Sequence, residues 1–250
     1  MKIKIINPNT TWSMTEKIGD CARRVAAAGT EIVAVSPSMG PASIESHYDE
    51  ALSVPGILDE IRTGEASSVD AYVIACFGDP GLYAAREAAR GPVIGIAEAA
   101  MHAASLIGNS FSVVTTLERT CGIAWHLAEM YGMRRFCRKV RACELNVLDL
   151  EQPGSDAYRI ILAECRQAMQ QDKVDSIVLG CAGMTDLCKK IESELGIAVV
   201  DGVTAAVKLA ESLVQLGLKT GKRRDLAFPL PKPYTGLLED FSRDRVPAGS

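Results

Sequence analysis

Two stretches of the chain resemble each other without a gap: VDAYVIACFG at residues 69–78 and VDSIVLGCAG at residues 174–183. At a constant offset of 105 residues the identical pairs are Val69/Val174, Asp70/Asp175, Val73/Val178, Cys76/Cys181 and Gly78/Gly183. The resemblance continues in PVIGIAEAA (92–100) against AVVDGVTAA (198–206), and more loosely in KIINPNT (4–10) against SVVTTLE (112–118). A repeat at a fixed spacing predicts an internal duplication, in which one folding unit is used twice.

Each unit alternates short apolar runs with helical patterns. Strands are predicted at 3–8, 30–37, 70–78, 110–119, near 141–147, and in the second copy at 175–183 and 197–203, and residues 91–100 are predicted as a strand that runs into the helix carrying His102. The helical patterns between them include 10–28 and a stretch around 52–66. Alternation of this kind predicts an α/β fold with parallel sheets that carry helices on both faces.

The composition narrows the class of protein. The chain has 250 residues, 48% apolar and 23% charged, and its net charge is −4. These values are typical of a globular protein with one large or two small domains, and they argue against a nucleic-acid or membrane surface as partner. Lys2 and Lys4 interrupt the first apolar run, so no signal peptide is expected. We therefore expect a cytoplasmic protein.

Eight cysteines are many for such a chain, but they form no C-x-x-C pair and no zinc-finger spacing with histidine. In a reducing compartment most should be free thiols that pack as small apolar groups. Cys165, for example, follows helical spacing with Ile161 and Ala168. No metal ion is predicted.

Cys76 and Cys181 differ from the others because each comes at the carboxyl end of a predicted central strand, where open parallel sheets bind ligands. A cysteine could also be repeated merely because a small apolar residue packs well at both positions. However, each cysteine is followed two residues later by a glycine, which allows close approach of a ligand. Asp79 and Thr185 are predicted to cap the helices that follow, which turns the Asp79 carboxylate away from the thiol. Nearby helix N-termini would then favour the thiolate form.

Other candidates are weaker. Cys121 and His126 share a predicted helix, but no duplicate supports a nucleophile there. His102 is expected to be buried or at a contact between lobes, and His47, in the loop before the second helix, is a possible substrate contact. The sequence has no phosphate-binding glycine motif, so no nucleotide cofactor is expected.

Six motifs along the chain form a recognisable set: INPNT (6–10), GPASIE (40–45), VIACFGDPGL (73–82), GIAEAA (95–100), VVTTL (113–117) and LGCAGM (179–184). In these motifs the chain resembles the hydantoin and allantoin racemases of the aspartate/glutamate racemase superfamily. The resemblance implies two similar Rossmann-like lobes related by a pseudo-twofold axis, with Cys76 and Cys181 on opposite walls of the cleft between them. We expect lobe 1 at 1–97, completed by about 206–240, lobe 2 at 98–205, and a disordered tail at 241–250. The C-terminal stretch from 219 is expected to wrap over lobe 1.

The implied reaction is inversion at C5 of a hydantoin ring without a cofactor. Inversion needs a base on one face of the carbon and an acid on the other, and two thiols can exchange these roles. Donors to the developing enolate are expected from the backbone of Gly78 and Gly183 and from Asn9 and Thr116. The predicted substrate-binding residues are Asn9, Ser43, Phe77, Gly78, Thr115, Thr116, Ala182 and Gly183.

Few aromatic residues (5%) favour allantoin over 5-aryl hydantoins, and 5-alkyl hydantoins stay open. A lyase like the arylmalonate decarboxylases is an alternative, but it needs one proton-donating cysteine rather than two. A non-catalytic sensor of small ligands would have no reason to hold a thiol on each wall. The resemblance also implies a homo-oligomer.

Overall fold

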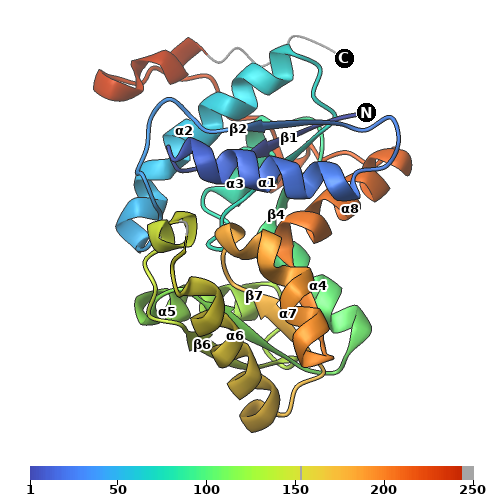
Figure 1. The fold of residues 1–250 in the computed structure, drawn as a ribbon. Helices are drawn as coiled ribbons and strands as arrows, with labels where there is room; N and C mark the ends of the chain where they lie inside the picture. The colour runs from blue at the N-terminus through green and yellow to red at the C-terminus, as the bar shows by residue number, and fades with distance from the viewer. Residues whose placement is uncertain (153, 244–250) are drawn as a thin grey trace.

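Two four-stranded parallel sheets organise the computed structural model, which describes residues 1–152 and 154–243 (Figure 1). Sheet 1 has the order β2-β1-β3-β4, formed by β1 (Lys2–Ile6), β2 (Glu31–Val35), β3 (Ala71–Ile74) and β4 (Val93–Gly95). Sheet 2 has the order β6-β5-β7-β8, formed by β5 (Phe111–Thr115), β6 (Cys137–Ala142), β7 (Ser176–Leu179) and β8 (Ala198–Asp201). The two orders are the same, which confirms the α/β fold of two similar lobes.

The strand register follows the duplication residue by residue. Ile5 of β1 lies opposite Val73 of β3, and Val113 of β5 lies opposite Val178 of β7. In each sheet the strand order switches between these two central strands: β2 lies on one side of β1 and β3 on the other, and β6 lies on one side of β5 and β7 on the other. A crevice forms outside their carboxyl ends, and this is the position where such sheets bind ligands.

Helices cover both faces of each sheet. In the first half these are α1 (Trp12–Val25), α2 (His47–Ala66), α3 (Leu82–Ala88) and α4 (Ile96–Ile107). In the second half they are α5 (Glu118–Met130), the 3-10 helix η1 (Val147–Glu151), α6 (Ala157–Gln167) with a π-helical end η2 (Ala168–Asp172), the 3-10 helix η3 (Ala182–Leu187), α7 (Cys188–Leu195) and α8 (Gly202–Gln215).

Two sequence-based boundaries were wrong. The second helix begins at His47 rather than near 52, because Ser46 caps it by accepting a hydrogen bond from the Asp49 N–H. The strand predicted near 141–147 lies at Cys137–Ala142, and the residues that follow turn away from sheet 2 into η1.

The last helix of each half packs on the other half. Helix α4 follows β4 of sheet 1 but packs against β7 and β8 of sheet 2, whereas α8 follows β8 and packs against β3 and β4 of sheet 1. The two helices also pack against each other (Figure 1). One buried core therefore runs through both lobes and includes Ile5, Val73, Val113 and Val178. The lobe boundaries at 97 and 205 stay a prediction. The packing of α8 against β3 and β4 of sheet 1 supports the expectation that lobe 1 is completed by residues after 205.

Beyond α8 the chain returns to lobe 1. Thr220 Oγ1 donates a hydrogen bond to the Gly91 carbonyl (2.6 Å) and Lys222 Nζ to the Glu87 carbonyl (2.9 Å). Two short 3-10 helices follow, η4 (Arg224–Leu226) and η5 (Gly236–Arg243). Of the tail predicted to be disordered, 241–250, residues 244–250 lie outside the described residues.

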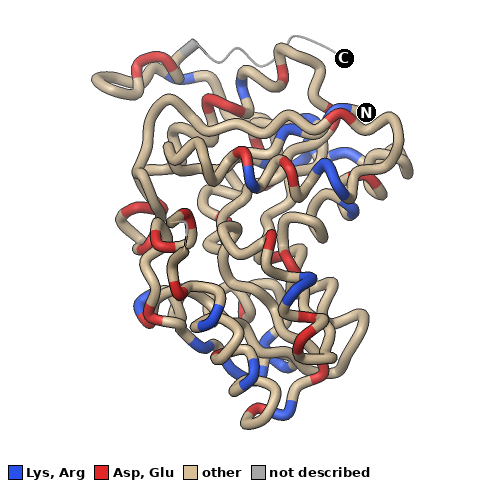
Figure 2. Tube along the Cα trace, in the orientation of Figure 1, with Lys and Arg blue, Asp and Glu red and all other residues tan. Residues whose placement is uncertain are grey.

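Basic and acidic residues are interspersed over both lobes (Figure 2). Within the described ranges, every helix is too short or too polar to cross a bilayer.

Candidate active site

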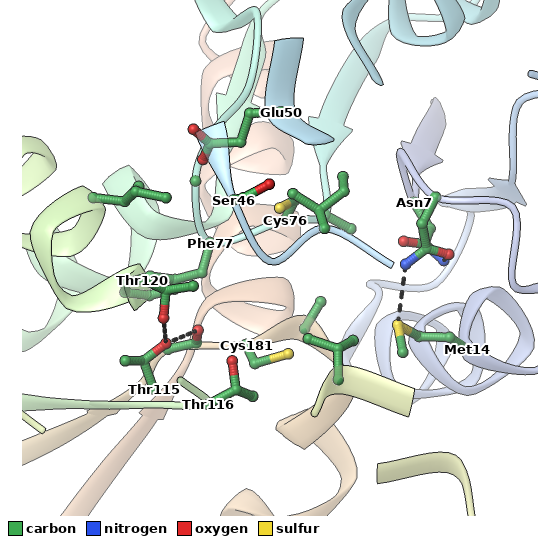
Figure 3. Close-up of a pocket in the computed structure, with 18 residues that line it drawn as sticks. Asn7, Met14, Ser46, Glu50, Cys76, Phe77, Thr115, Thr116, Thr120 and Cys181 are labelled. Carbon is green, nitrogen blue, oxygen red and sulfur yellow. Dashed lines mark hydrogen bonds between the residues drawn. The ribbon is translucent and has the colours of Figure 1, made fainter. Parts of the chain in front are cut away.

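Cys76 and Cys181 come from different lobes and line the same cavity (Figure 3). Cys76 follows β3 by two residues, and Cys181 follows β7 by two residues. Each thiol therefore lies at the carboxyl end of a central strand, and the pseudo-twofold relation of the lobes brings the two ends together. They are the two cysteines with intermediate exposure, whereas the other six are buried.

Six of the eight predicted substrate-binding residues line this cavity: Asn9, Phe77, Gly78, Thr115, Thr116 and Ala182. Ser43 and Gly183 are not among the described residues that line it. Several lining residues were not predicted, namely Asn7, Met14, Ile44, Ser46, Glu50, Ala75, Thr120, Ile123, Val147 and Gly180. By strand register Asn7 of lobe 1 is equivalent to Thr115 of lobe 2. Because Thr115 was predicted to bind substrate, the alignment of KIINPNT with SVVTTLE could have identified Asn7 as well.

The environments of the two thiols have one feature in common. The Gly78 N–H donates to the sulfur of Cys76 and the Gly183 N–H to the sulfur of Cys181. Each of these hydrogen bonds lowers the thiol pKa, but burial outweighs it. Burial raises the pKa of Cys181 to about 11 and that of Cys76 further still, and Glu50 and Cys181 add smaller increases at Cys76.

The expectation of thiolates favoured by helix N-termini was therefore wrong. Helix α3 begins only at Leu82, six residues after Cys76, with Gly81 as its N-cap. Cys181 directly precedes η3, but its burial raises the pKa more than the backbone N–H lowers it. Thr185 lies inside η3, and the N-cap of α7 is Leu187, so Thr185 does not cap that helix.

Asp79 is a cap, but of a different helix from the one predicted. Its carboxylate accepts hydrogen bonds from the backbone N–H groups of Ala97 (3.1 Å) and Glu98 (2.9 Å), in the first turn of α4. It also accepts one from the hydroxyl of Tyr131 (2.7 Å), at the end of α5 in lobe 2. Burial raises the pKa of Asp79 to about 7, against the effect of these hydrogen bonds. These partners agree with the capping role expected of Asp79, while its charge still contributes to the raised pKa of Cys76.

Amide and hydroxyl groups form the inner wall of the cavity. Asn7 is 1% exposed and donates from Nδ2 to Asn9 Oδ1 and to Thr15 Oγ1, both at 2.9 Å. Within residues 1–152 and 154–243, the one hydrogen-bond partner of Asn9 Nδ2 is the thioether of Met14 (3.4 Å), a weak acceptor, so this donor can serve a ligand. On the other lobe, Thr115 Oγ1 donates to the Gly180 carbonyl (3.1 Å). This wall can offer both donors and acceptors to a polar ring.

Two contacts join the lobes beside the cavity. Lys17 Nζ of α1 pairs with Glu151 Oε1 of η1 at 2.6 Å, and Glu45 Oε1 accepts a hydrogen bond from the Val147 N–H at 2.7 Å. Because Val147 itself lines the cavity, these contacts hold η1 against the site. The Lys17 charge also lowers the pKa of Cys181, though by less than burial raises it.

The weaker candidates lie elsewhere. Cys121 is buried beside Glu118, which with burial raises its pKa to about 11, and His126 is exposed. His102 Nδ1 lies 2.8 Å from the Glu98 carbonyl on α4. His47 is exposed but touches Glu50, which does line the cavity.

Comparison with known proteins agrees with this geometry. A family model for Asp/Glu/Hydantoin racemase matches residues 3–210. The hydantoin racemase of Rhizobium meliloti is 52% identical over 236 residues, covering 94% of this chain and 98% of that protein. The structure of the allantoin racemase from Klebsiella pneumoniae is similar with a TM-score of 0.96 and 51% identity, covering 98% of this chain and 100% of the other. Arylmalonate decarboxylase, at 16% identity and a TM-score of 0.61, covering 90% and 97%, shares the fold alone.

Two like lobes that each present a thiol to one cavity define the class as the Asp/Glu racemase superfamily. Within it, the chain belongs to the hydantoin/allantoin racemase family, and it is therefore an isomerase.

Proposed function

We propose that the chain inverts C5 of a hydantoin ring by a mechanism with two thiols and no cofactor, and that allantoin is its substrate. The observation that carries the proposal is the presence of Cys76 and Cys181, from opposite lobes, in one cavity. Each follows the equivalent strand, and each accepts a hydrogen bond from the N–H two residues later. A pair so alike suits a reaction that must run equally well in both directions.

In the proposed step, one cysteine as thiolate removes the C5 proton, and the electron pair of the C–H bond moves into the ring as an enolate. The other cysteine, as thiol, then delivers its proton to the opposite face of C5. The thiol and thiolate have exchanged places at the end, so the enzyme is ready for the other enantiomer. The raised pKa values make each thiolate a strong base, which suits removal of a proton from carbon.

The enolate oxygen needs a hydrogen-bond donor. The Gly78 and Gly183 N–H groups, expected in this role, already donate to the sulfurs. The Asn9 Nδ2 and the Thr116 hydroxyl, both on the cavity wall, are the better candidates.

Allantoin is favoured by the polarity of the cavity. Among the described lining residues, Phe77 is the one aromatic side chain, and Asn7, Asn9, Ser46, Glu50, Thr115, Thr116 and Thr120 are polar. A ureido group at C5 can use such partners, whereas an alkyl or aryl group cannot. A role in purine degradation would follow, and from the family resemblance we also propose a cytoplasmic homo-oligomer.

Circular dichroism tests the proposal directly. Purified protein is mixed with single-enantiomer allantoin, 5-methylhydantoin and 5-benzylhydantoin, and loss of the signal is compared with the buffer rate. We expect the highest kcat/KM with allantoin. A higher kcat/KM with 5-benzylhydantoin would reject allantoin as the substrate, and no loss above buffer with all three would reject hydantoin racemisation.

A further inference from the structure

Glu50 places a carboxylate in the wall of the cavity beside Cys76. It lies in the first turn of α2, and its side chain is 16% exposed. Its Oε2 is 3.2 Å from Nδ1 of His47, whose side chain is 81% exposed. The carboxylate thus lies where the cavity meets solvent, and Figure 3 shows it on the lobe 1 side with Ser46 and Cys76.

The other oxygen of this carboxylate points at the loop that carries Cys76. A Cβ added to Gly78 would overlap Oε1 of Glu50, so the missing side chain of Gly78 makes room for this carboxylate. Among the described residues that line the cavity, Glu50 is the one with a charged side chain. Burial raises its pKa, since His47 satisfies it only in part. A ligand that brings N–H donors would supply what this carboxylate lacks.

We infer that Glu50 is a specificity-determining residue that accepts hydrogen bonds from the N–H groups of a ureido substituent at C5. This inference rests on the proposed function. A urea presents two parallel N–H bonds along one edge, and a carboxylate can accept both. A 5-alkyl hydantoin has nothing to offer at this position, so it leaves the half-buried carboxylate without its partner.

The hydantoin ring also carries N–H groups, but the wall formed by Asn7, Asn9 and Thr116 is a better partner for them than Glu50. Asn7, Asn9 and Thr116 are 1%, 4% and 3% exposed, and they offer amide and hydroxyl groups to a polar ring. With C5 between the two thiols and the ring against this wall, the substituent extends toward the outer end, where Glu50 lies beside exposed His47.

The test compares kcat/KM for allantoin and for 5-methylhydantoin on the same preparation of each variant. Glu50→Gln and Glu50→Ala are made, with Glu16→Gln, an exposed carboxylate on α1, as the control for loss of one charge. Because the readout is the ratio of two substrates, the fraction of folded protein cancels. We expect the ratio to fall about 10-fold in Glu50→Gln and about 100-fold in Glu50→Ala, as for loss of charged hydrogen bonds, and to be unchanged in the control.

The outcomes separate this inference from the proposed function. An equal loss for both substrates in the Glu50 variants would assign Glu50 to the ring or to Cys76 and overturn the inference alone. If the wild type racemises 5-methylhydantoin but not allantoin, the inference about Glu50 is overturned, whereas the proposed racemisation of hydantoins stands. A wild type inactive on both would overturn both.

Discussion

The carboxylate of Asp79 occupies the space that a side chain at Gly95 would fill: a Cβ at this glycine would overlap both oxygens. In lobe 2 the residue equivalent to Gly95 is Asp201, which caps α8 by accepting from the N–H groups of Val203 and Thr204. The residue equivalent to Asp79 is Met184. Helices α4 and α8 are therefore each capped by a carboxylate, but the carboxylate that caps α4 comes from the loop that carries Cys76.

This relation predicts a compensating pair of substitutions. Asp79→Ala should lower the free energy of unfolding by about 2–4 kcal/mol, since it leaves two buried N–H groups and the Tyr131 hydroxyl without an acceptor. Gly95→Asp should also destabilise, because its side chain overlaps Asp79. The double variant, which copies the arrangement of lobe 2, should be more stable than either single variant in urea unfolding. If the double variant instead loses the sum of the two single decreases in the free energy of unfolding, the compensation is contradicted.

Asp79 also predicts how stability depends on pH. Its pKa is about 7 in the folded protein, against an ordinary value of 3.8. Between these values the unfolded chain has already lost the proton that the folded protein keeps, so rising pH favours unfolding. The stabilising contribution of Asp79 to the free energy of unfolding is fully present below pH 4. It decreases as the pH rises to about 7 and is lost above that pH.

A pKa of about 7 in place of 3.8 corresponds to a contribution of about 4 kcal/mol to the free energy of unfolding. The measurement is the free energy of unfolding of the wild type and of Asp79→Asn at pH 4–8. The wild type minus variant difference should fall over that range, while a flat or rising difference would show that the carboxylate is charged when folded.

The two thiols should differ in reactivity. Iodoacetamide should modify Cys181 before Cys76, because the pKa of Cys181 is raised less, and both before the six buried cysteines. Peptide mass spectrometry at pH 7, 8 and 9 measures this order, and the rate at Cys181 should increase about tenfold per pH unit below its pKa. First modification of Cys121 or Cys137, with activity retained, would contradict it.

Single substitutions separate the roles of the thiols. Cys76→Ser and Cys181→Ser should each abolish racemisation, because serine is too weak a base and inversion needs both faces served. In heavy water the remaining thiolate can still remove the proton on its own side and return deuterium there. Proton NMR should therefore show exchange without inversion, for one enantiomer in one variant and for its mirror image in the other. A single variant that racemises near the wild-type rate would rule out the two-thiol mechanism.

The duplication made the lobes and the cysteine pair predictable, because both depend on strands whose residues are repeated in the chain. Asp79 was assigned to the wrong helix because it is followed by Pro80, and an aspartate before a proline is a local pattern typical of a helix N-terminus. Its true partners, Ala97 and Glu98, are 18 and 19 residues away and are accessible only because Gly95 lacks a side chain.

Other features depend on burial, which the sequence does not show. The thiol pKa values were expected to be low because of nearby helix N-termini, but burial in the cavity raises them. Glu50 was missed because it belongs to no repeat and because the start of α2 was placed five residues too late.

The exchange of α4 and α8 makes this single chain equivalent to a domain-swapped dimer whose two subunits have been joined. Residues 1–107 contain a complete sheet and a helix that packs on a partner. Two copies of that fragment related by a true twofold axis would reproduce the architecture, with Cys76 present on both walls. In a joined chain the two halves need not be identical. Glu50 lines the cavity from lobe 1, whereas Thr120 and Val147, which line it from lobe 2, carry no charge, so the site between two like lobes is asymmetric.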